Sequence, residues 1–361
     1  MPAVTSAAGN PSPKKSRLAL AGPVPMASAS SGGFAGNFPP PPFVVPTKGA
    51  LMRRFFGLLA LAVAGGFLSS CVVGDWGDTG RFREDFHYSW PLNPGARLAV
   101  ESQNGSVEIT GWEQNTIDIA GTKYASDESL LRDTHVDISH DPDSVRIRTN
   151  SPEFFHGNAG ATYTIHVPKR VLLDLIHTSN GPIRVDGVEG NVRLRTSNGG
   201  IHLSDVKGEA DVQTSNGGID LDNQNGAVRL RTSNGHIKGE CRGGRFEAET
   251  SNGPVEARLM DLSESWPVRV ETSNGHVDLR VEGRIPDMRV STNNSSIELL
   301  LPASASARLD ATTSHGDINS DFDVTTRGGT ISKDRLEGDI GGGGPTIDLH
   351  TSNSSIRIRK R

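Results

Sequence analysis

The sequence is poor in aromatic residues, in cysteine and in charge of one sign. Aromatic residues make up 5% of the 361 residues and hydrophobic residues 34%, which is little for the core of a compact enzyme. Two cysteines, Cys71 and Cys241, are too few for a disulfide framework in a chain of this length. The formal net charge of -5 gives no electrostatic reason to expect a nucleic acid as partner. Glycine is abundant instead, with 42 residues, and this favours short strands between frequent turns.

The chain opens with two segments that we exclude from the folded core. Residues 1–51 are rich in Pro, Gly, Ala and Ser, a composition that cannot bury enough apolar surface to fold. Residues 52–71 open with Met-Arg-Arg, continue as an apolar stretch from 55 to 67, and end in Leu-Ser-Ser-Cys. This order predicts a signal peptide, because the apolar stretch is shorter than the roughly 20 residues that span a bilayer. A signal sequence belongs at the start of a chain, so we expect Met52 to be the initiator and 1–51 to be an untranslated low-complexity extension. Genuine translation of 1–51 remains the alternative.

The last four residues of the signal peptide resemble the lipobox of bacterial lipoproteins, a leucine and two small residues before a cysteine. The resemblance implies cleavage before Cys71 and acylation of its thiol and new amino terminus. Each buried CH₂ of an acyl chain contributes about 0.8 kcal/mol to membrane binding, so several chains anchor a protein firmly. We therefore expect an exported protein that is membrane-anchored in the bacterial cell envelope, on the periplasmic or cell-surface side, with residues 72–95 as a tether. An uncleaved anchor or a chance apolar segment is the alternative.

A tetrapeptide repeat dominates the rest of the chain. Identical copies of Thr-Ser-Asn-Gly begin at Thr178, Thr196, Thr214, Thr232, Thr250 and Thr272. The first five copies are evenly spaced and the sixth follows after a slightly longer interval. Degenerate copies begin at Ser102, Thr292, Thr313 and Thr351. A fixed period of about 20 residues is typical of stacked repeats, in which each rung packs on its neighbours.

Alternation on both sides of the motif predicts β-strands. In the segment from Val192 to Thr196, apolar residues occupy every second position and arginines lie between them. We expect the Asn-Gly pair to turn the chain because both residues tolerate a positive φ, and we expect a second turn near Gly190 and its equivalents. The predicted fold class is all-β: residues 171–361 form a right- or left-handed β-solenoid, similar to a single-stranded β-helix, with rungs of about 18–22 residues. A less regular β section, residues 96–170, precedes it.

The alternation also predicts a structural role for the motif. If Val192 and Leu194 point inward, Thr196 does so too, and we expect Asn198 to point inward at the corner. Asparagines stacked about 4.8 Å apart can hydrogen-bond along the stack. We predict a structural ladder made of Thr178, Asn180, Thr196, Asn198, Thr214, Asn216, Thr232, Asn234, Thr250, Asn252, Thr272 and Asn274. An active-site role is disfavoured because a catalytic motif occurs once per site, whereas this motif recurs at nearly every rung.

Two features near the end of the chain suggest how the solenoid finishes. The stretch from Thr325 to Pro345 lacks a clear motif, so we expect one distorted rung there. The terminal segment, 356–361, ends in charged residues, which would discourage edge-to-edge pairing if it forms the last strand.

The motif, its period and the glycines between copies resemble a bacterial family of putative adhesins, the domain of unknown function 4097. The matching segments are Tyr163–Pro168, Thr178–Ile183 and Gly187–Val192, and the resemblance covers roughly residues 96–361. It implies a β-solenoid on the cell envelope, with adhesion as the proposed role. The family supplies no catalytic residues to carry over.

Three groups of side chains could carry chemistry on the outward positions. Arg193, Arg195, Arg229 and Arg231 would line one strand face, as a binding strip for anionic polysaccharide or lipid headgroups or as an ordinary solvated face. His202, His236 and His276 follow the turn but not in successive rungs, so a metal row is disfavoured. Asp220 with Asp222, or Asp205 with Glu209, could serve as the carboxylate pair of a glycosidase. We expect no metal and no cofactor.

The leading hypothesis is a non-enzymatic envelope lipoprotein whose solenoid surface serves adhesion or binding. Its expected partners are the membrane, through the lipid anchor, and a polysaccharide or another envelope protein, with no nucleic acid. A scaffold that self-associates through its stacking ends is one alternative. A polysaccharide-active β-helix enzyme is the other.

Overall fold

The alternating segments form strands that bury every second side chain. In β10 (Val192–Thr196), Val192 and Leu194 are buried, whereas Arg193 between them is exposed. The computed structural model describes residues 81–152, 158–326 and 331–361, all of which belong to one unit of the chain, Val72–Arg361. The signal peptide, Cys71 and the extension 1–51 lie outside the described residues.

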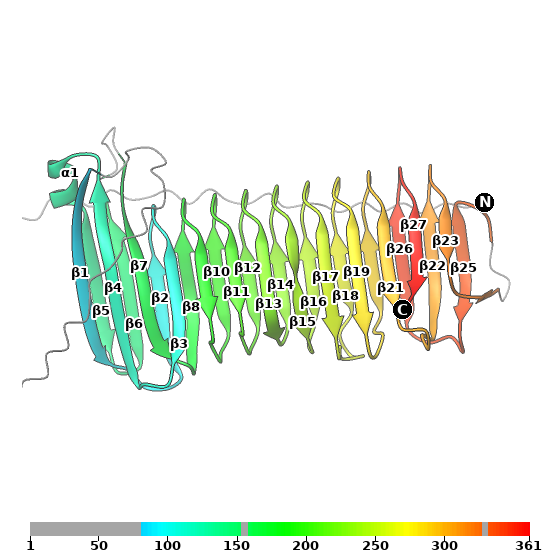
Figure 1. The fold of residues 1–361 in the computed structure, drawn as a ribbon, viewed down its shortest axis with the longest axis horizontal. Helices are drawn as coiled ribbons and strands as arrows, with labels where there is room; N and C mark the ends of the chain where they lie inside the picture. The colour runs from blue at the N-terminus through cyan, green and yellow to red at the C-terminus, as the bar shows by residue number, and fades with distance from the viewer. Residues whose placement is uncertain (1–80, 153–157, 327–330) are drawn as a thin grey trace, which may run out of the picture. The chain divides into compact units, whose positions relative to one another are not determined.

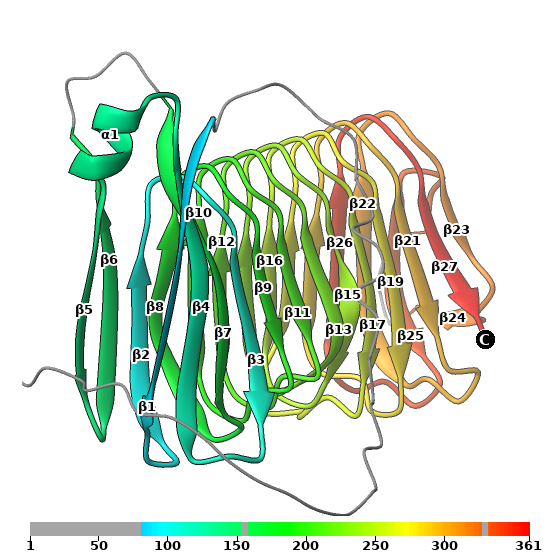
Figure 2. The same cartoon turned by 60° about the vertical axis from the view of Figure 1, so that its left-hand side comes forward.

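The strands form two long sheets that face each other (Figures 1 and 2). Sheet A has 13 strands. In spatial order they are β1 (Phe82–Pro91), β4 (Thr116–Ala125), β7 (Ala159–Pro168), β3 (Val107–Trp112), β9 (Ile183–Asp186), β11 (Ile201–Ser204), β13 (Ile219–Asn225), β15 (Ile237–Arg242), β17 (Val255–Met260), β19 (Val277–Glu282), β21 (Ile297–Leu301), β27 (Ile356–Lys360) and β23 (Ile318–Ser320).

Sheet B has 14 strands. From the same end they are β5 (His135–Asp141), β6 (Ser144–Asn150), β2 (Ala96–Glu101), β8 (Val171–Thr178), β10, β12 (Ala210–Gln213), β14 (Val228–Arg231), β16 (Phe246–Glu249), β18 (Val268–Glu271), β20 (Met288–Ser291), β26 (Thr346–Thr351), β22 (Ala307–Thr313), β25 (Arg335–Ile340) and β24 (Val324–Thr325). The helix α1 (Glu128–Asp133) lies near the N-terminal ends of the sheets (Figure 2).

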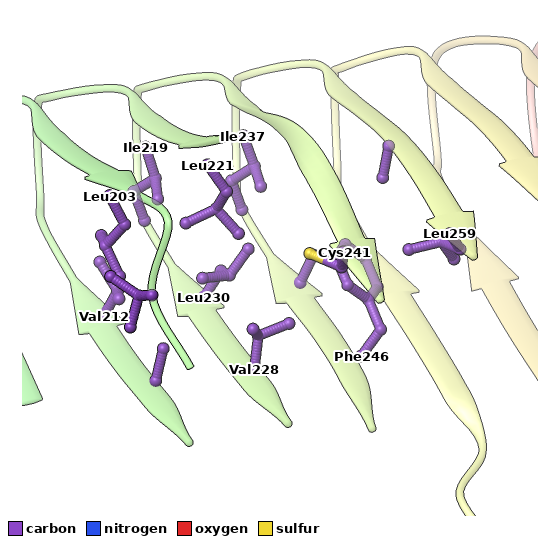
Figure 3. Packing of buried hydrophobic residues seen from close by; sticks show 14 of the residues in the cluster. Leu203, Val212, Ile219, Leu221, Val228, Leu230, Ile237, Cys241, Phe246 and Leu259 are labelled. Atoms are coloured by element: carbon purple, nitrogen blue, oxygen red, sulfur yellow. The ribbon is translucent and has the colours of Figure 1, made fainter. Parts of the chain in front are cut away.

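Each rung contributes one strand to each sheet, in parallel register with its neighbours. Leu203 pairs with Leu221 in sheet A, and Val212 pairs with Leu230 in sheet B. The apolar side chains of the two sheets meet between them and form one continuous core, part of which Figure 3 shows. The predicted β-solenoid is therefore confirmed, and one period of the motif equals one rung.

The order of the rungs in space differs from their order in the chain at both ends. The last strands, β26 and β27, lie between the rung β20/β21 and the rung β22/β23 (Figure 1). At the other end, β2 and β3 lie between the rung β6/β7 and the rung β8/β9. The expectation that the charged C-terminal segment forms an exposed edge is wrong, because β27 pairs with β21 on one side and β23 on the other.

Antiparallel strands close both ends of the stack. At the N-terminal end, β1 pairs with β4 and β5 with β6; at the C-terminal end, β25 pairs with β22 and β24 with β25. The distorted rung expected between Thr325 and Pro345 contains the antiparallel strand β25. The expectation that residues 72–95 form a tether is wrong for the second half of this segment. Residues 82–91 form β1, because alternate apolar residues there pack beside β4, and Leu92 is buried in the core.

Candidate functional site

The motif threonines close the corner of each rung from the inside. Thr196 is 5% exposed, and its Oγ1 donates to the carbonyl of Gly181 in the preceding rung at 3.1 Å. The same Oγ1 accepts from the backbone N–H of Gly199 at 3.2 Å. The donated bond recurs from Thr178 to Thr292 at 2.9–3.2 Å, and the accepted bond recurs from Thr196 to Thr272. A buried hydroxyl is thus fully bonded and joins two rungs.

The motif asparagines form a ladder on the outside of the same corner. Asn198 Nδ2 donates to Asn180 Oδ1 at 2.6 Å, and every later asparagine repeats the bond at 2.7–2.8 Å. The ladder joins Asn104, Asn180, Asn198, Asn216, Asn234, Asn252, Asn274, Asn294 and Asn353. The expected inward position of these side chains is wrong: they are exposed, because the strand alternation ends at the threonine.

The motif glycines permit close stacking and do not supply an unusual backbone angle. All six copies lie in the described part of the chain, and neither their asparagines nor their glycines have a positive φ. The expected reason for the Asn-Gly pair is therefore wrong. A Cβ placed on each motif glycine would lie only 1.7–1.9 Å from the carbonyl oxygen of the previous rung. Positive φ values occur at the second turn instead, as at Asp205 (51°) and Asn223 (55°).

The outward face of sheet B carries charges in register across the rungs. The four candidate arginines all meet carboxylates of the next rung. Arg193 and Arg195 both pair with Asp211, at 3.7 and 3.1 Å. Because the carboxylate lies between the two arginine rungs, these side chains do not form a free cationic strip.

The second pair of candidate arginines behaves in the same way. Arg229 lies 2.8 Å from Glu247, and Arg231 lies 3.2 Å from Glu249. Burial raises the pKa of Glu247, but the hydrogen bond from Arg229 and the charges of Arg245 and other arginines outweigh it, so the pKa is lowered. The face is therefore a grid of paired ions.

A groove of about 760 Å³ crosses this grid from β14 to β26. It lies over the strands that contain Arg229, Glu249, Arg269, Arg289 and Asp348. Its volume falls in the range of small-molecule sites, but its lining is charged and polar rather than apolar. The groove is a hollow on the outward face of sheet B that is large enough for a small-molecule ligand.

The carboxylates considered for catalysis lie on the surface beside basic partners. Asp220 is 3.2 Å from His236, and Asp222 is 3.4 Å from His202. His276 pairs with Glu256 at 3.4 Å. Within the described ranges, no group of three potential ligands could hold a metal ion.

The other carboxylate pair considered for catalysis is divided between two contacts. Asp205 accepts from Asn223 Nδ2 at 2.5 Å, and Glu209 lies 3.8 Å from Arg245. Each acidic side chain therefore serves a contact between rungs.

Cys241 is 1% exposed and belongs to the hydrophobic core (Figure 3). Burial raises the pKa of its thiol to about 12, with a smaller contribution from Glu240. A thiol in this state is neither a nucleophile nor a metal ligand at neutral pH. None of the helices in the described ranges is long and apolar enough to cross a membrane.

A family model described as Toastrack DUF4097 matches residues 95–359. The chain belongs to this family. The match agrees with the rungs described above and covers both sheets except β1. No curated protein matches the sequence.

Three crystal structures are similar to this Toastrack chain at low identity. A putative cell adhesion protein from Clostridium sporogenes is 12% identical, with a TM-score of 0.24, over 77% of this chain and 100% of that chain. A putative adhesin from Bacteroides fragilis is 11% identical, with a TM-score of 0.30, over 77% and 97%. A putative lipid binding protein from Parabacteroides distasonis is 11% identical, with a TM-score of 0.31, over 78% and 98%.

Sequence reasoning missed the groove in this Toastrack chain. Its central residues, Arg269 and Arg289, lie outside the two arginine pairs of the sequence pattern, although Arg269 follows that pattern closely. The loop beside the groove holds Trp266, which is 51% exposed. The signal was present in the spacing, because the longer interval between the motifs at Thr250 and Thr272 contains this loop.

Proposed function

We propose that this chain is an exported lipoprotein of the bacterial envelope that binds an extended ligand and does not catalyse a reaction. Acylated Cys71 would hold it at the membrane, and the outward faces of the two sheets would be available to the ligand. The signal-peptide pattern of residues 52–71 supports the first part. Membership in the Toastrack family agrees with the second, because the fold offers long flat faces.

The observation that carries the binding proposal is the repetition of the outward face. Strands of sheet B place Arg193, Asp211, Arg229 and Glu247 side by side in one register row. Rungs about 4.8 Å apart therefore present similar chemistry many times along the stack. A repeating ligand such as a polysaccharide can contact several rungs at once, and linked contacts raise the overall affinity well above that of one contact.

The two alternative functions have less support. Head-to-tail stacking into a scaffold would require two matching ends, whereas here the ends carry different antiparallel strands. A glycosidase needs an acid with a raised pKa opposite a second carboxylate. Asp220 and Asp222 instead lie beside histidines on the surface.

Metabolic labelling with palmitate tests the anchor. The wild-type chain and Cys241→Ser should both incorporate the label, and Cys71→Ser should not. The two variants each remove one thiol, so Cys241→Ser controls for acylation at the buried cysteine. Label retained in Cys71→Ser would contradict the lipoprotein assignment.

Binding to a panel of polysaccharides, with product analysis, tests the second part of the proposal. We expect retention of the wild-type chain on at least one polymer without release of shorter products. Release of products, abolished by Asp220→Asn, would support the enzyme instead. Filaments that grow with protein concentration would support the scaffold.

A further inference from the structure

The alternation of charge on sheet B breaks at β18, inside the groove, and again where Asp310 lies between Asp348 and Glu337. Along one register row, Glu247 is followed by Arg269 and then by Arg289, so two guanidinium groups occupy adjacent strands. Along the neighbouring row, Glu249 is followed directly by Glu271. Strands of a sheet lie about 4.8 Å apart, and like charges at directly opposite positions destabilise it.

Two of these side chains form no ion pair or hydrogen bond in the described part of the chain, although the charge of Arg269 helps to lower the pKa of Glu247. The carboxylates around them are already engaged: Glu247 with Arg229, Glu249 with Arg231, and Asp348 with Arg289 at 3.5 Å. Within the described ranges, neither Arg269 nor Glu271 forms an ion pair or a hydrogen bond through its side chain. An exposed cation and an exposed anion thus lie two positions apart on β18, on the same face of the sheet.

An exposed aromatic residue directly precedes a residue of the same groove. Trp266 precedes Pro267, which lines the groove, and the guanidinium carbon of Arg245 lies 5.6 Å from the centroid of the indole. With 51% of its surface exposed, Trp266 is the most exposed aromatic residue in the part of the chain that the structure describes. An exposed indole offers a flat apolar surface on which a ring can stack.

We infer that this groove binds an acidic polysaccharide, and that one acidic sugar residue sits over β18 and β20. This inference rests on the proposed function and names the class of its ligand. The sugar carboxylate would lie between Arg269 and Arg289, where it relieves the repulsion of the two guanidinium groups. Its hydroxyl groups would donate to Glu271, and the face of a neighbouring sugar ring would stack on Trp266. A hydroxyl-rich acid matches all three features together: an unpaired cation, an unpaired carboxylate and an exposed indole.

Calorimetric titration of the full chain with a defined oligogalacturonate tests the inference. The chain is kept in a detergent without a sugar headgroup, and the matched ligand is the same oligomer with its carboxylates methyl-esterified. We expect Arg269→Gln to weaken binding about 10- to 100-fold, since it removes a hydrogen bond to a charged group. Trp266→Ala should weaken it roughly twofold to tenfold. Arg132→Gln, in the exposed ion pair with Glu128 on α1 and away from both sheet faces, should leave the affinity within about twofold.

The esterified oligomer separates a site from a diffuse charge effect. It should bind the wild type at least as weakly as the acidic oligomer binds Arg269→Gln, because esterification removes the charged contacts to both arginines and the substitution removes only one. Equal losses for Arg269→Gln and Arg132→Gln would overturn the inference, as would equal affinity of the wild type for the two oligomers. Absence of binding to the acidic oligomer would overturn it too, while palmitate labelling of Cys71 reports on the proposed anchoring independently. Circular dichroism melts of each variant show that a loss of binding is not a loss of folding.

Discussion

The close stacking in the corner makes a sharp prediction at two neighbouring glycines. Gly199 belongs to a motif, and a Cβ placed on it would lie 1.9 Å from the carbonyl oxygen of Gly181. Gly200 is the next residue in the same turn, and its Cβ would have its nearest neighbour, the carbonyl oxygen of Gly218, at 3.6 Å. We therefore expect Gly199→Ala to destabilise the chain strongly and Gly200→Ala to leave it nearly unchanged.

The magnitude follows from the bonds that the clash would break. Real Cβ atoms essentially never lie closer than 3.0 Å to another heavy atom, whereas the Cβ introduced by Gly199→Ala would lie 1.9 Å from the carbonyl oxygen of Gly181. The two rungs must therefore separate at this corner to accommodate it. Four hydrogen bonds span the interface there, among them Thr196 Oγ1 to Gly181 at 3.1 Å and Asn198 N–H to Ser179 at 2.9 Å. At roughly 0.5–1.5 kcal/mol net for each bond, their loss amounts to about 2–6 kcal/mol. Gly200→Ala should change stability by less than about 1 kcal/mol, and toward stabilisation, since alanine reduces the entropy of the unfolded chain.

Hydrogen exchange and urea unfolding measure the two parts of this prediction. The free energy of unfolding gives the total loss, and exchange of the backbone amides between 192 and 204 shows whether the loss begins at this corner. Local measurement is needed because stacked repeats can unfold in parts. The reasoning would be refuted if the two alanine variants were equally stable, or if Gly200→Ala were the less stable one.

Three further predictions concern the ladder and the core. Asn216→Ala removes two ladder bonds of 2.7 Å, and Asn353→Ala removes one. Thermal melting should therefore show a destabilisation on the order of 1–2 kcal/mol for Asn216→Ala, about twice that for Asn353→Ala. Equal effects would contradict a ladder in which each bond contributes. Gln224 is fully buried with an unpaired Oε1, and the equivalent residue of the preceding rung is the buried Val206. Gln224→Val should therefore raise the free energy of unfolding by about 1 kcal/mol. A lower free energy of unfolding would show that the hydrogen bond from Nε2 to the carbonyl of Gly208 outweighs the unpaired oxygen. Burial raises the pKa of the Cys241 thiol from 9.0 to about 12, so the thiol loses its proton at a lower pH in the unfolded chain than in the folded one. The contribution of the buried neutral thiol to the free energy of unfolding is therefore complete below pH 9. It is lost as the pH rises toward 12, at up to about 1.4 kcal/mol per pH unit. Cys241→Ala should flatten the first part of that decline in urea titrations at successive pH values, and an unchanged slope between pH 9 and 10 would show that the thiol is not protected.

The features that could be predicted from the sequence are those with local causes. Alternation within a segment such as Val192–Thr196 predicts a strand whatever its neighbours are. The constant spacing of the motif predicts which side chains meet, so the contact between Arg229 and Glu247 follows from placing one rung on the next. These signals were sufficient for the sheets, the rungs and the buried threonines.

The features that the sequence did not reveal depend on the neighbouring rung. Whether the side chain of an Asn at a corner points inward or outward can be decided only when the course of the turn is known. The exposed position of Asn198 therefore became clear only from the structure. The reason for Gly199 is the carbonyl of Gly181 in the preceding rung, a contact that no turn propensity describes. The place of β26 beside β20 was equally hidden, because every motif copy can pair with every other and the sequence does not say which pairs form.

The interleaving of rungs at the two ends has a consequence for how the chain folds as it is made. In the native order β22 and β23 pair with β26 and β27 and not with β20 and β21, so residues 307–320 have their native neighbours only after residues 346–360 have been made. A stack wound in order from one end could add each rung as it emerges, whereas this order delays the native closure of the C-terminal end. A chain truncated shortly before residue 346 would therefore lack the layer between β20/β21 and β22/β23, and any pairing of β22 and β23 with the rest of the stack would be non-native.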